Sequence, residues 1–413
     1  MGDDPIIEQR YSIHTDDPHV RFHLKRLMDQ QMGIPIRVSK TYPKRGTDIM
    51  MKVRVMVSEK GPNEVMEYDS PLEDQTFLPE MQLVVCSWGN DLYRIRATKN
   101  AFNRIIRMNP LPEIMFVEGS TDGKFYFEYV KEYKHVNYLP VDLTAPMFHN
   151  LFMKEILWNY GVSYVLEIAP ETKKICYLDA DCSFVDMYSF KVISEALDKY
   201  EVISPFQITY YETRKEDDIN YGIMHSTGYQ FTLQNGLPGW FGFGVAMTTE
   251  ALKKYFNNEL PCSCAGLGDI FLWYMLAGYR NLRNYHAIPF YKHILQNYRI
   301  KDAKVGFAPT VLVHHYHGKM SQRQYTAKYH ILRRCVPQPF GELARVGNSS
   351  LMCWNDKPEV QRYRYFLDNL VYFKNKGLRR LSVQEATEFF EWLMKRRNEP
   401  PTVIKQLLPV RPL

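Results

Sequence analysis

The strongest chemical signal in the sequence is a pair of carboxylates, Asp179 and Asp181, that follows the apolar run Ile175 to Leu178. In an open α/β sheet, ligands bind beyond the carboxyl ends of the strands. Mg²⁺ or Mn²⁺ is typically held by one or two carboxylates together with phosphate oxygens. The pair therefore predicts a divalent-cation site suited to a nucleotide diphosphate. The alternative, a solvated turn, would leave two like charges side by side at the end of a buried strand.

A cluster of histidines forms the second signal. His314, His315 and His317 follow an apolar run, and Lys319 and Arg323 come soon after them. Neutral imidazole nitrogens suit a borderline metal such as Mn²⁺, and the two cationic side chains could hold phosphate charge. Three histidines within four positions exceed what core filling requires, so the cluster favours a functional role.

Two further segments could contribute to a site. Asp269 follows Gly268 and precedes an apolar helix, so it is either the N-cap of that helix or a general base or substrate clamp. Trp240 lies in a glycine-rich segment whose backbone a ligand could approach closely, and its ring could stack on that ligand. Core packing explains Trp240 equally well.

The elements around these residues alternate between strands and helices. Apolar runs over 82–88, 114–117 and 174–178 predict buried parallel strands, and helices are expected over 92–108 and 146–160. This alternation predicts βαβ units and a Rossmann-like region over about 82–200. The first strand is not followed by G-x-G-x-x-G, which gives a dinucleotide-binding site little support.

Three regions are expected along the chain. Residues 1–80 form an N-terminal appendage with a helix near Val20 to Gln31 and a strand over Met50 to Val57. Residues 81–335 form the catalytic α/β domain, and residues 336–413 form a mainly helical, basic region. Its basic side chains predict solvated helix faces more readily than a nucleic-acid surface.

Composition limits the class of protein. Of the 413 residues, 45% are hydrophobic and 24% are charged, which excludes a disordered chain. The formal charge of +6 permits an anionic partner without requiring one. No apolar run is long enough to span a membrane, and the first residues lack a signal peptide, so we expect a cytoplasmic protein without a membrane partner. The seven cysteines lack C-x-x-C spacing and are expected to be reduced.

Taken in order, these motifs resemble those of glycosyltransferases of the GT-A fold, over about residues 82–335. The resemblance implies a Rossmann-like mixed sheet flanked by helices. It also implies that Asp179 contacts the donor ribose or the metal, and that Asp181 ligates the metal bridging the diphosphate. Asp269 then falls where the family's acceptor-side carboxylate binds or deprotonates the attacking hydroxyl.

The same resemblance extends to the histidine cluster. The segment from His315 to Gly318 is similar to the H-x-x-G segment that supplies a third metal ligand in several GT-A enzymes. This similarity favours His315 as the third ligand, and His317 is close enough in the sequence to be the ligand instead. Lys319 and Arg323 fall where groups that stabilise the leaving phosphate are expected, and Trp240 is expected on the donor side. The implied cofactor is Mn²⁺ or Mg²⁺, and the implied donor is a nucleotide sugar such as UDP-glucose.

The run from His315 to Tyr325 also resembles a segment of GT-A-like proteins encoded by bacteriophages, and some of these proteins are associated with sugar-decorated DNA bases. It is similar, too, to the enzyme that glucosylates hydroxymethyluracil to make base J. The expected acceptor is therefore a hydroxymethylated pyrimidine in DNA, and for a viral protein the location is the host cytoplasm. A glycan or protein acceptor is the alternative.

Two other classes of protein are alternatives to a glycosyltransferase. The segment from Asp179 to Ser183 also fits the D-x-D-x-[ST] motif of haloacid-dehalogenase-type phosphatases. A protein with an inert α/β domain and a nucleic-acid-binding tail is the other alternative. The motifs leave the oligomeric state and the stereochemistry of transfer open.

Overall fold

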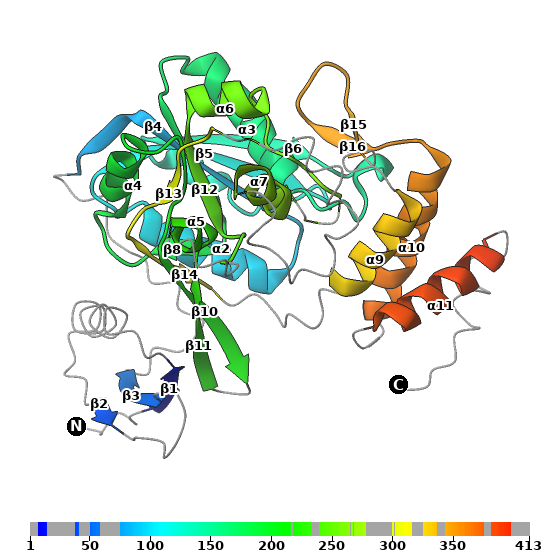
Figure 1. The fold of residues 1–413 in the computed structure, drawn as a ribbon, viewed down its shortest axis with the longest axis horizontal. Helices are drawn as coiled ribbons and strands as arrows, with labels where there is room; N and C mark the ends of the chain where they lie inside the picture. The colour runs from blue at the N-terminus through cyan, green and yellow to red at the C-terminus, as the bar shows by residue number, and fades with distance from the viewer. Residues whose placement is uncertain are drawn as a thin grey trace.

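The computed structural model describes residues 7–14, 38–40, 50–57, 75–215, 218–232, 239–264, 266, 268–277, 300, 302–315, 325–336, 343–375 and 381–397. Its centre is a mixed sheet of seven strands with helices on both faces (Figure 1). The predicted α/β class, with a Rossmann-like sheet flanked by helices, is confirmed.

The central sheet has the strand order β13-β9-β12-β7-β4-β5-β6. Its parallel core contains β4 (Phe77–Trp88), β5 (Leu111–Ser120), β6 (Val136–Asp142) and β7 (Lys174–Asp179). The other half contains β9 (Val202–Ser204), β12 (Gly244–Thr248) and β13 (Val305–Phe307). Because β12 runs antiparallel to β7, its first residues lie beside the carboxyl end of β7. Both segments therefore border the edge at which ligands bind in such sheets.

Successive residues of each central strand point to opposite faces of the sheet, and the apolar ones form a separate core on each face. On one face, α2 (Leu92–Ile105) and α4 (Ser189–Leu197) pack against Leu83 and Val85. On the other, α3 (Lys154–Ile168), α6 (Thr249–Phe256) and α7 (Gly268–Ala277) pack against Val84 and Cys86. Both faces of β4 are thus covered, which is why its sequence is a continuous apolar run rather than an alternating one.

The helix predicted over 146–160 is wrong in its bounds. A short 3-10 turn, η2 (Pro146–Phe148), is followed by a loop, and α3 begins only at Lys154. Asn150 in this loop has a φ of 56°, in the left-handed region, which interrupts a right-handed helix. A segment distant in sequence also fixes the loop, because the Phe152 N–H donates to the Cys264 carbonyl at 3.2 Å. As a result, Lys154 lies in the first turn of α3.

A second sheet of four strands lies beside the first, in the order β11-β10-β14-β8. Its strands are β8 (Cys182–Phe184), β10 (Ile208–Lys215), β11 (Asp218–His225) and β14 (Val311–His314), and α5 (Thr227–Thr232) follows β11. In the antiparallel pair of β14 and β8, His314 lies opposite Cys182. This register brings His314 and His315 beside the D-x-D motif.

The two ends of the chain form separate groups of elements. At the N-terminal end, β1 (Ile7–His14), β2 (Val38–Lys40) and β3 (Met50–Val57) form an antiparallel sheet, so the strand predicted at Met50–Val57 is confirmed. The helix predicted near Val20 to Gln31 lies outside the described residues. The boundary between residues 80 and 81 remains a prediction.

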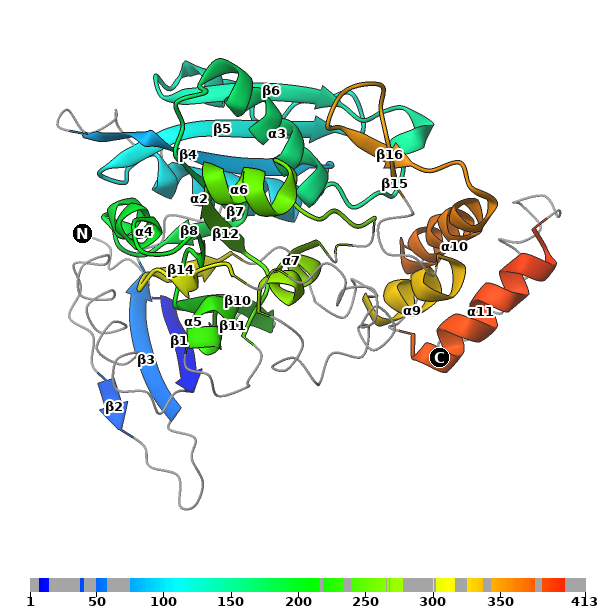
Figure 2. The same cartoon turned by 45° about the horizontal axis from the view of Figure 1, so that its top comes forward.

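At the C-terminal end, three helices pack together, as Figure 2 shows. They are α9 (Tyr325–Cys335), α10 (Pro358–Asn375) and α11 (Val383–Lys395), and the hairpin of β15 (Leu343–Arg345) and β16 (Met352–Trp354) lies between the first two in sequence. The boundary between residues 335 and 336 also remains a prediction. No helix within the described ranges is both long and apolar enough to cross a membrane.

A buried carboxylate fixes the loop after β5, which contains the 3-10 turn η1 (Glu128–Glu132). Glu118 is 2% exposed and accepts hydrogen bonds from the backbone N–H of Phe127 at 3.0 Å and from the Tyr138 hydroxyl at 2.7 Å. Burial and then the neighbouring Glu118 raise the pKa of Tyr138, so its hydroxyl keeps its proton and remains a donor.

We expect Glu118→Gln to lower the free energy of unfolding by about 2 kcal/mol, because hydrogen bonds to a buried charged group are stronger than those to an amide. Chemical denaturation would measure the change. The matched control is Glu128→Gln, whose exposed carboxylate pairs with Lys131 on the same loop and should contribute less than about 0.5 kcal/mol. Equal effects of the two changes would contradict the prediction.

Candidate functional site

An open cleft lies at the carboxyl ends of β4 and β7, beside the start of β12, and encloses about 680 Å³, open solvent included. The cleft brings together five of the residues singled out from the sequence: Asp179, Asp181, Trp240, Asp269 and His314. It is also lined by Lys154, Trp88, Arg94, Phe152 and Phe243.

Lys154 connects the carboxylates of the cleft. Its Nζ lies 3.4 Å from Asp179 Oδ1, 3.7 Å from Glu155 Oε1, and donates a hydrogen bond to Asp269 Oδ2 at 3.2 Å. Burial by itself lowers the pKa of a lysine, but the three carboxylates raise the pKa of Lys154 well above its ordinary value. The side chain is therefore a permanent cation at neutral pH, shared between residues from three different elements.

Asp179 is the last residue of β7, and its backbone N–H donates to the Phe243 carbonyl at 3.0 Å. Burial raises the pKa of this carboxyl group, Lys154 opposes the rise, and the charges of Asp181 and Asp269 add to it. Removal of the Lys154 charge would thus favour the neutral form of Asp179, so the lysine favours the ionised form of this carboxyl group.

The second carboxylate of the motif lies beside a histidine. His314 Nε2 is 3.6 Å from Asp181 Oδ1. The imidazole ring of His314 stacks on Tyr211 with 4.7 Å between ring centroids, and the Phe243 ring lies 4.6 Å away. Ring contacts on two sides restrict the orientation of the imidazole and direct it at Asp181.

His315 is placed differently. Its ring Nε2 lies 2.9 Å from the Ser183 hydroxyl oxygen, and its backbone N–H donates to the Asp181 carbonyl at 2.8 Å. Burial, with the charge of Arg104 added, lowers the pKa of His315 to about 4, so the ring is neutral at physiological pH. His314 rather than His315 lines the cleft, and the assignment of His315 as a metal ligand stays a prediction.

The other predicted residues of this segment, His317, Lys319 and Arg323, lie outside the described residues. Within the described part of the chain, no three His, Cys, Asp or Glu side chains are arranged to hold a metal ion by themselves. Asp179, Asp181 and His314 carry ligand types that suit Mn²⁺ or Mg²⁺, and the metal site itself stays a prediction.

The glycine-rich segment forms part of the wall of the cleft. A Cβ at Gly242 would lie 3.1 Å from Asp269 Oδ2 and 3.2 Å from Trp240 Nε1, so the absence of a side chain leaves room for both groups. Phe243 has a φ of 78°, which is rare for an aromatic residue and marks strain of the kind stored at functional sites. The Trp240 ring stacks on Phe243 at 5.4 Å, and its indole N–H finds no hydrogen-bond partner among the described residues. Trp240 can therefore offer a ligand both a ring face and a donor.

Asp269 lies in the first turn of α7, directly after Gly268. Its Oδ1 accepts from the Ile270 N–H at 2.7 Å, while Oδ2 faces Lys154. The carboxylate thus accepts from the backbone of its own helix and also reaches into the cleft. Because Asp269 lies inside α7, it is not the N-cap of that helix, and its function as a general base or substrate clamp stays a prediction.

Sequence reasoning missed three contributors to the cleft: Lys154, Arg94 and Trp88. Arg94 Cζ lies 4.6 Å from the centre of the Trp88 ring, and Trp88 packs edge-on against Phe152 at 5.2 Å. For Lys154 a signal was present, since it and Glu155 are adjacent opposite charges within an otherwise apolar run from Leu151 to Trp158. Buried charges of this kind are paired or functional.

The two histidines can be distinguished by substitution. We expect His314→Gln to weaken Mn²⁺ binding in the presence of a nucleoside diphosphate about tenfold or more, as loss of a ligand or of a group that orients one does. His315→Gln should have a smaller effect because its ring bonds Ser183. Isothermal titration calorimetry would measure both. A larger loss for His315→Gln would instead assign the ligand to His315.

Comparison with known proteins gives no family assignment. No family model matches the sequence, and no curated protein matches it either. Among solved structures, the chain is similar to 4-diphosphocytidyl-2C-methyl-D-erythritol synthase from Anaerococcus prevotii, with 12% sequence identity, a TM-score of 0.30, and coverage of 56% of this chain and 86% of the other. A similarity this distant transfers no activity, and the function is argued below from the cleft itself.

Proposed function

We propose that the protein is a metal-dependent glycosyltransferase of the GT-A type, which transfers a sugar from a nucleotide-sugar donor to an acceptor hydroxyl. The observation that carries the proposal is the sharing of the Lys154 ammonium between Asp179 and Asp269 in one cleft. The carboxylate expected on the donor side and the carboxylate expected on the acceptor side thereby lie within 3.4 Å of the same cation. A Rossmann-like sheet with the D-x-D motif at a strand end is consistent with this function.

Each residue of the cleft has a task in such a transfer. Asp179 and Asp181, with His314, would hold Mn²⁺ or Mg²⁺, which when bound neutralises the donor diphosphate. Overall, the bond from the anomeric carbon to the phosphate oxygen breaks, the diphosphate leaves with the electron pair, and the acceptor oxygen bonds to the anomeric carbon. Asp269 is placed to bind the acceptor hydroxyl and take its proton, while Trp240 offers a stacking face to the donor.

The phosphatase alternative has less support. Haloacid-dehalogenase-type enzymes carry the D-x-D-x-[ST] motif on their first core strand. Here β4 and β5 precede β7 in the chain and lie in the same sheet, so the motif is on a later strand. The position of β7 therefore favours the glycosyltransferase.

The test measures hydrolysis of UDP-, GDP- and dTDP-sugars by the protein, and the change in its unfolding temperature that each sugar nucleotide causes, with and without Mn²⁺. We expect slow, metal-dependent release of one nucleoside diphosphate, with UDP-glucose as the first candidate, and loss of this release in Asp181→Ala. The absence of any metal-dependent response to every nucleotide sugar would contradict the proposal, and phosphatase substrates and DNA binding would then be tested.

For the acceptor, we propose the hydroxyl of a hydroxymethylated pyrimidine in DNA. The positive charge of the chain and the exposed cations Arg362, Lys395 and Arg397 of the C-terminal helical region support an anionic partner. Arg364, by contrast, donates to the Pro146 carbonyl and serves the fold. Arg379 and Arg380 lie outside the described residues. A target base would have to leave the duplex stack to reach the cleft.

Binding of a duplex with hydroxymethylated pyrimidines should weaken as salt rises, because phosphate contacts release counterions. Replacing Lys395 and Arg397 together with alanine should reduce the slope of log K against log salt by up to about 2, close to one unit per lost contact. Fluorescence anisotropy would measure it, with a double change at the exposed Lys173 and Lys253 as control. If the modified duplex neither binds nor accepts labelled sugar, the acceptor is a glycan or a protein instead.

A further inference from the structure

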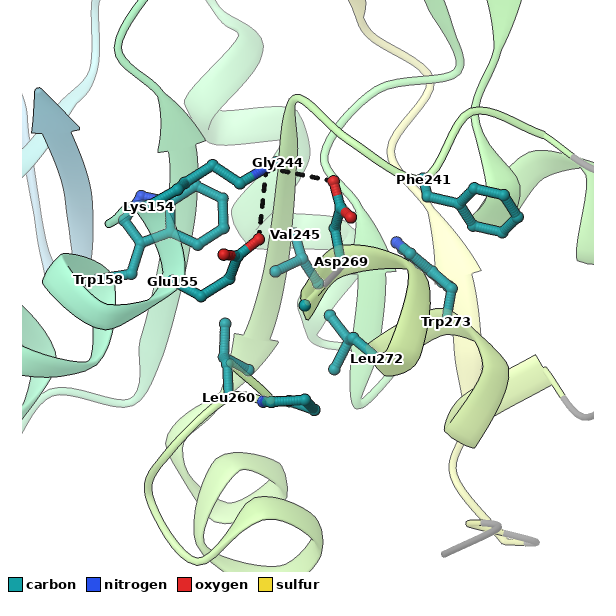
Figure 3. A pocket seen from close by; sticks show the side chains of 12 residues that line it. Lys154, Glu155, Trp158, Phe241, Gly244, Val245, Leu260, Asp269, Leu272 and Trp273 are labelled. Atoms are coloured by element: carbon teal, nitrogen blue, oxygen red, sulfur yellow. Dashed lines mark hydrogen bonds and ion pairs between the residues drawn. The ribbon is translucent and has the colours of Figure 1, made fainter. Parts of the chain in front are cut away.

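A second, smaller cavity lies behind the cleft, between α3 and the start of α7 (Figure 3). Lys154 and Asp269 line both the cleft and this inner cavity, whereas Glu155 lines the inner cavity. The rest of its wall is mostly apolar or aromatic and includes Trp158, Phe241, Val245, Leu260, Leu272 and Trp273. The ion pairs of Lys154 therefore separate an open polar cleft from an inner, mainly apolar space.

Glu155 is an unusual residue in this space. It is 1% exposed, and neither carboxylate oxygen has a hydrogen-bond partner within the described part of the chain. Its Oε1 lies 3.7 Å from Lys154 Nζ, drawn as a dashed line in Figure 3. A buried polar group without hydrogen bonds costs about 1 to 3 kcal/mol, so its presence calls for an explanation.

The packing of Glu155 ties it to the acceptor-side carboxylate. A Cβ built at Gly268 would lie 2.6 Å from Glu155 Cγ and 2.7 Å from Cδ. The Glu155 side chain thus occupies the space that a side chain on the first residue of α7 would need. Asp269 is the next residue, so Glu155 packs beside the backbone that presents Asp269 to Lys154.

We propose that Glu155 is a positioning residue, whose carboxyl group behind the cleft determines how the Lys154 ammonium is shared between Asp179 and Asp269. The activity arm of its test rests on the proposed function, and the stability arm does not. A neutral carboxyl group leaves the lysine charge to the two aspartates. An ionised one is a third negative partner that draws Nζ toward the inner cavity and away from the cleft.

Charges around Glu155 come from each element packed against it: Lys154 on α3, Asp269 on α7 and Asp179 on β7. Burial raises the pKa of Glu155 to about 8, Lys154 opposes this rise, and Asp269 and Asp179 add to it. The carboxyl group is therefore mostly neutral at physiological pH and ionises in the mildly alkaline range. The position of Lys154 Nζ between the cleft and the inner cavity should therefore change over that pH range.

The activity arm compares wild type, Glu155→Gln and Glu167→Gln. Glu167 is the matched control, since it is an exposed glutamate on the same helix. For metal-dependent hydrolysis of the donor, we expect kcat/KM of wild type to fall about tenfold from about pH 7 to about pH 9, as a single ionisation predicts. Glu155→Gln should lack this fall, and Glu167→Gln should retain it. An alkaline fall that is unchanged in Glu155→Gln would overturn the inference.

The stability arm needs no substrate. Because the pKa of Glu155 in the folded protein, about 8, exceeds its ordinary value of 4.5, the folded state binds more protons between these limits and loses stability as the pH rises through them. Glu155→Gln escapes this loss, so its unfolding temperature should exceed that of wild type by several degrees at alkaline pH and converge with it at acid pH. Glu167→Gln should follow wild type at every pH.

The two arms separate the inference from the proposed function. If wild type turns over no nucleotide sugar, the proposed function fails and the unfolding temperatures alone decide the inference. If turnover is present and Glu155→Gln matches wild type in both arms, the inference fails and the proposed function stands. Should Glu155→Gln not fold, Glu155→Met, which fills the cavity with an uncharged side chain of similar length, takes its place with the same expected outcomes.

Discussion

Replacing Lys154 with methionine is expected to lower kcat/KM for the donor by at least about a hundredfold, as loss of a preorganised charge in an active site does. It should also lower the free energy of unfolding by about 3 to 5 kcal/mol, because removal of one member of a buried ion pair leaves uncompensated charge. Here Asp179 and Asp269 would lose a cation at 3.4 Å and 3.2 Å. Steady-state kinetics and chemical denaturation would measure the two effects.

The controls for Lys154 distinguish charge from shape. Lys154→Arg keeps the charge and should recover most of the stability but less of the activity, since a planar guanidinium does not reproduce the geometry of a single ammonium. Lys173→Met, at an exposed lysine just before β7, should leave both quantities unchanged. Wild-type turnover by a folded Lys154→Met variant would contradict the function assigned to the cleft.

Asp181→Asn is expected to abolish the metal dependence of donor hydrolysis and to lower its rate by at least about a hundredfold, while the protein stays folded. The amide keeps the shape of the side chain but removes the negative charge beside His314 Nε2, 3.6 Å away. Chelation of the metal by EDTA should reduce wild type to the same residual rate, and added Mn²⁺ should restore wild type alone.

The matched control for Asp181 is Asp356→Asn, an exposed carboxylate between β16 and α10. Its hydrolysis rate and Mn²⁺ response should equal those of wild type. If Asp181→Asn retains full Mn²⁺ activation, the cation is held elsewhere and the D-x-D motif has another purpose.

The sheet was predictable from the sequence because its central strands are buried on both faces. The runs ending at Trp88 and Asp179 are continuous and apolar, and both became parallel strands of the central sheet. Since the carboxyl ends of parallel strands meet at one edge, the position of Asp179 at such an end also indicated where a cleft would form.

The details of the cleft depend on long-range contacts that no local pattern encodes. Periodicity could not give the start of α3, because a left-handed residue, Asn150, and contacts from distant segments set it. The placement of His314 depends on the register between β14 and β8, in which it lies opposite Cys182, whereas His315 follows the end of β14. The sequence thus identified the segments of the cleft but not which lysine or histidine lines it.

The loop before α3 is held by residues that come much later in the chain. Asn150 donates to Asp368, 218 residues away, and the Trp354 indole N–H donates to the His149 carbonyl, 205 residues away. During synthesis, these partners leave the ribosome long after the central strands have emerged, so we expect the loop before α3 to be fixed only after α10 has emerged. Nascent chains arrested before Trp354 should accordingly be cleaved by protease at this loop, whereas released chains should resist cleavage there.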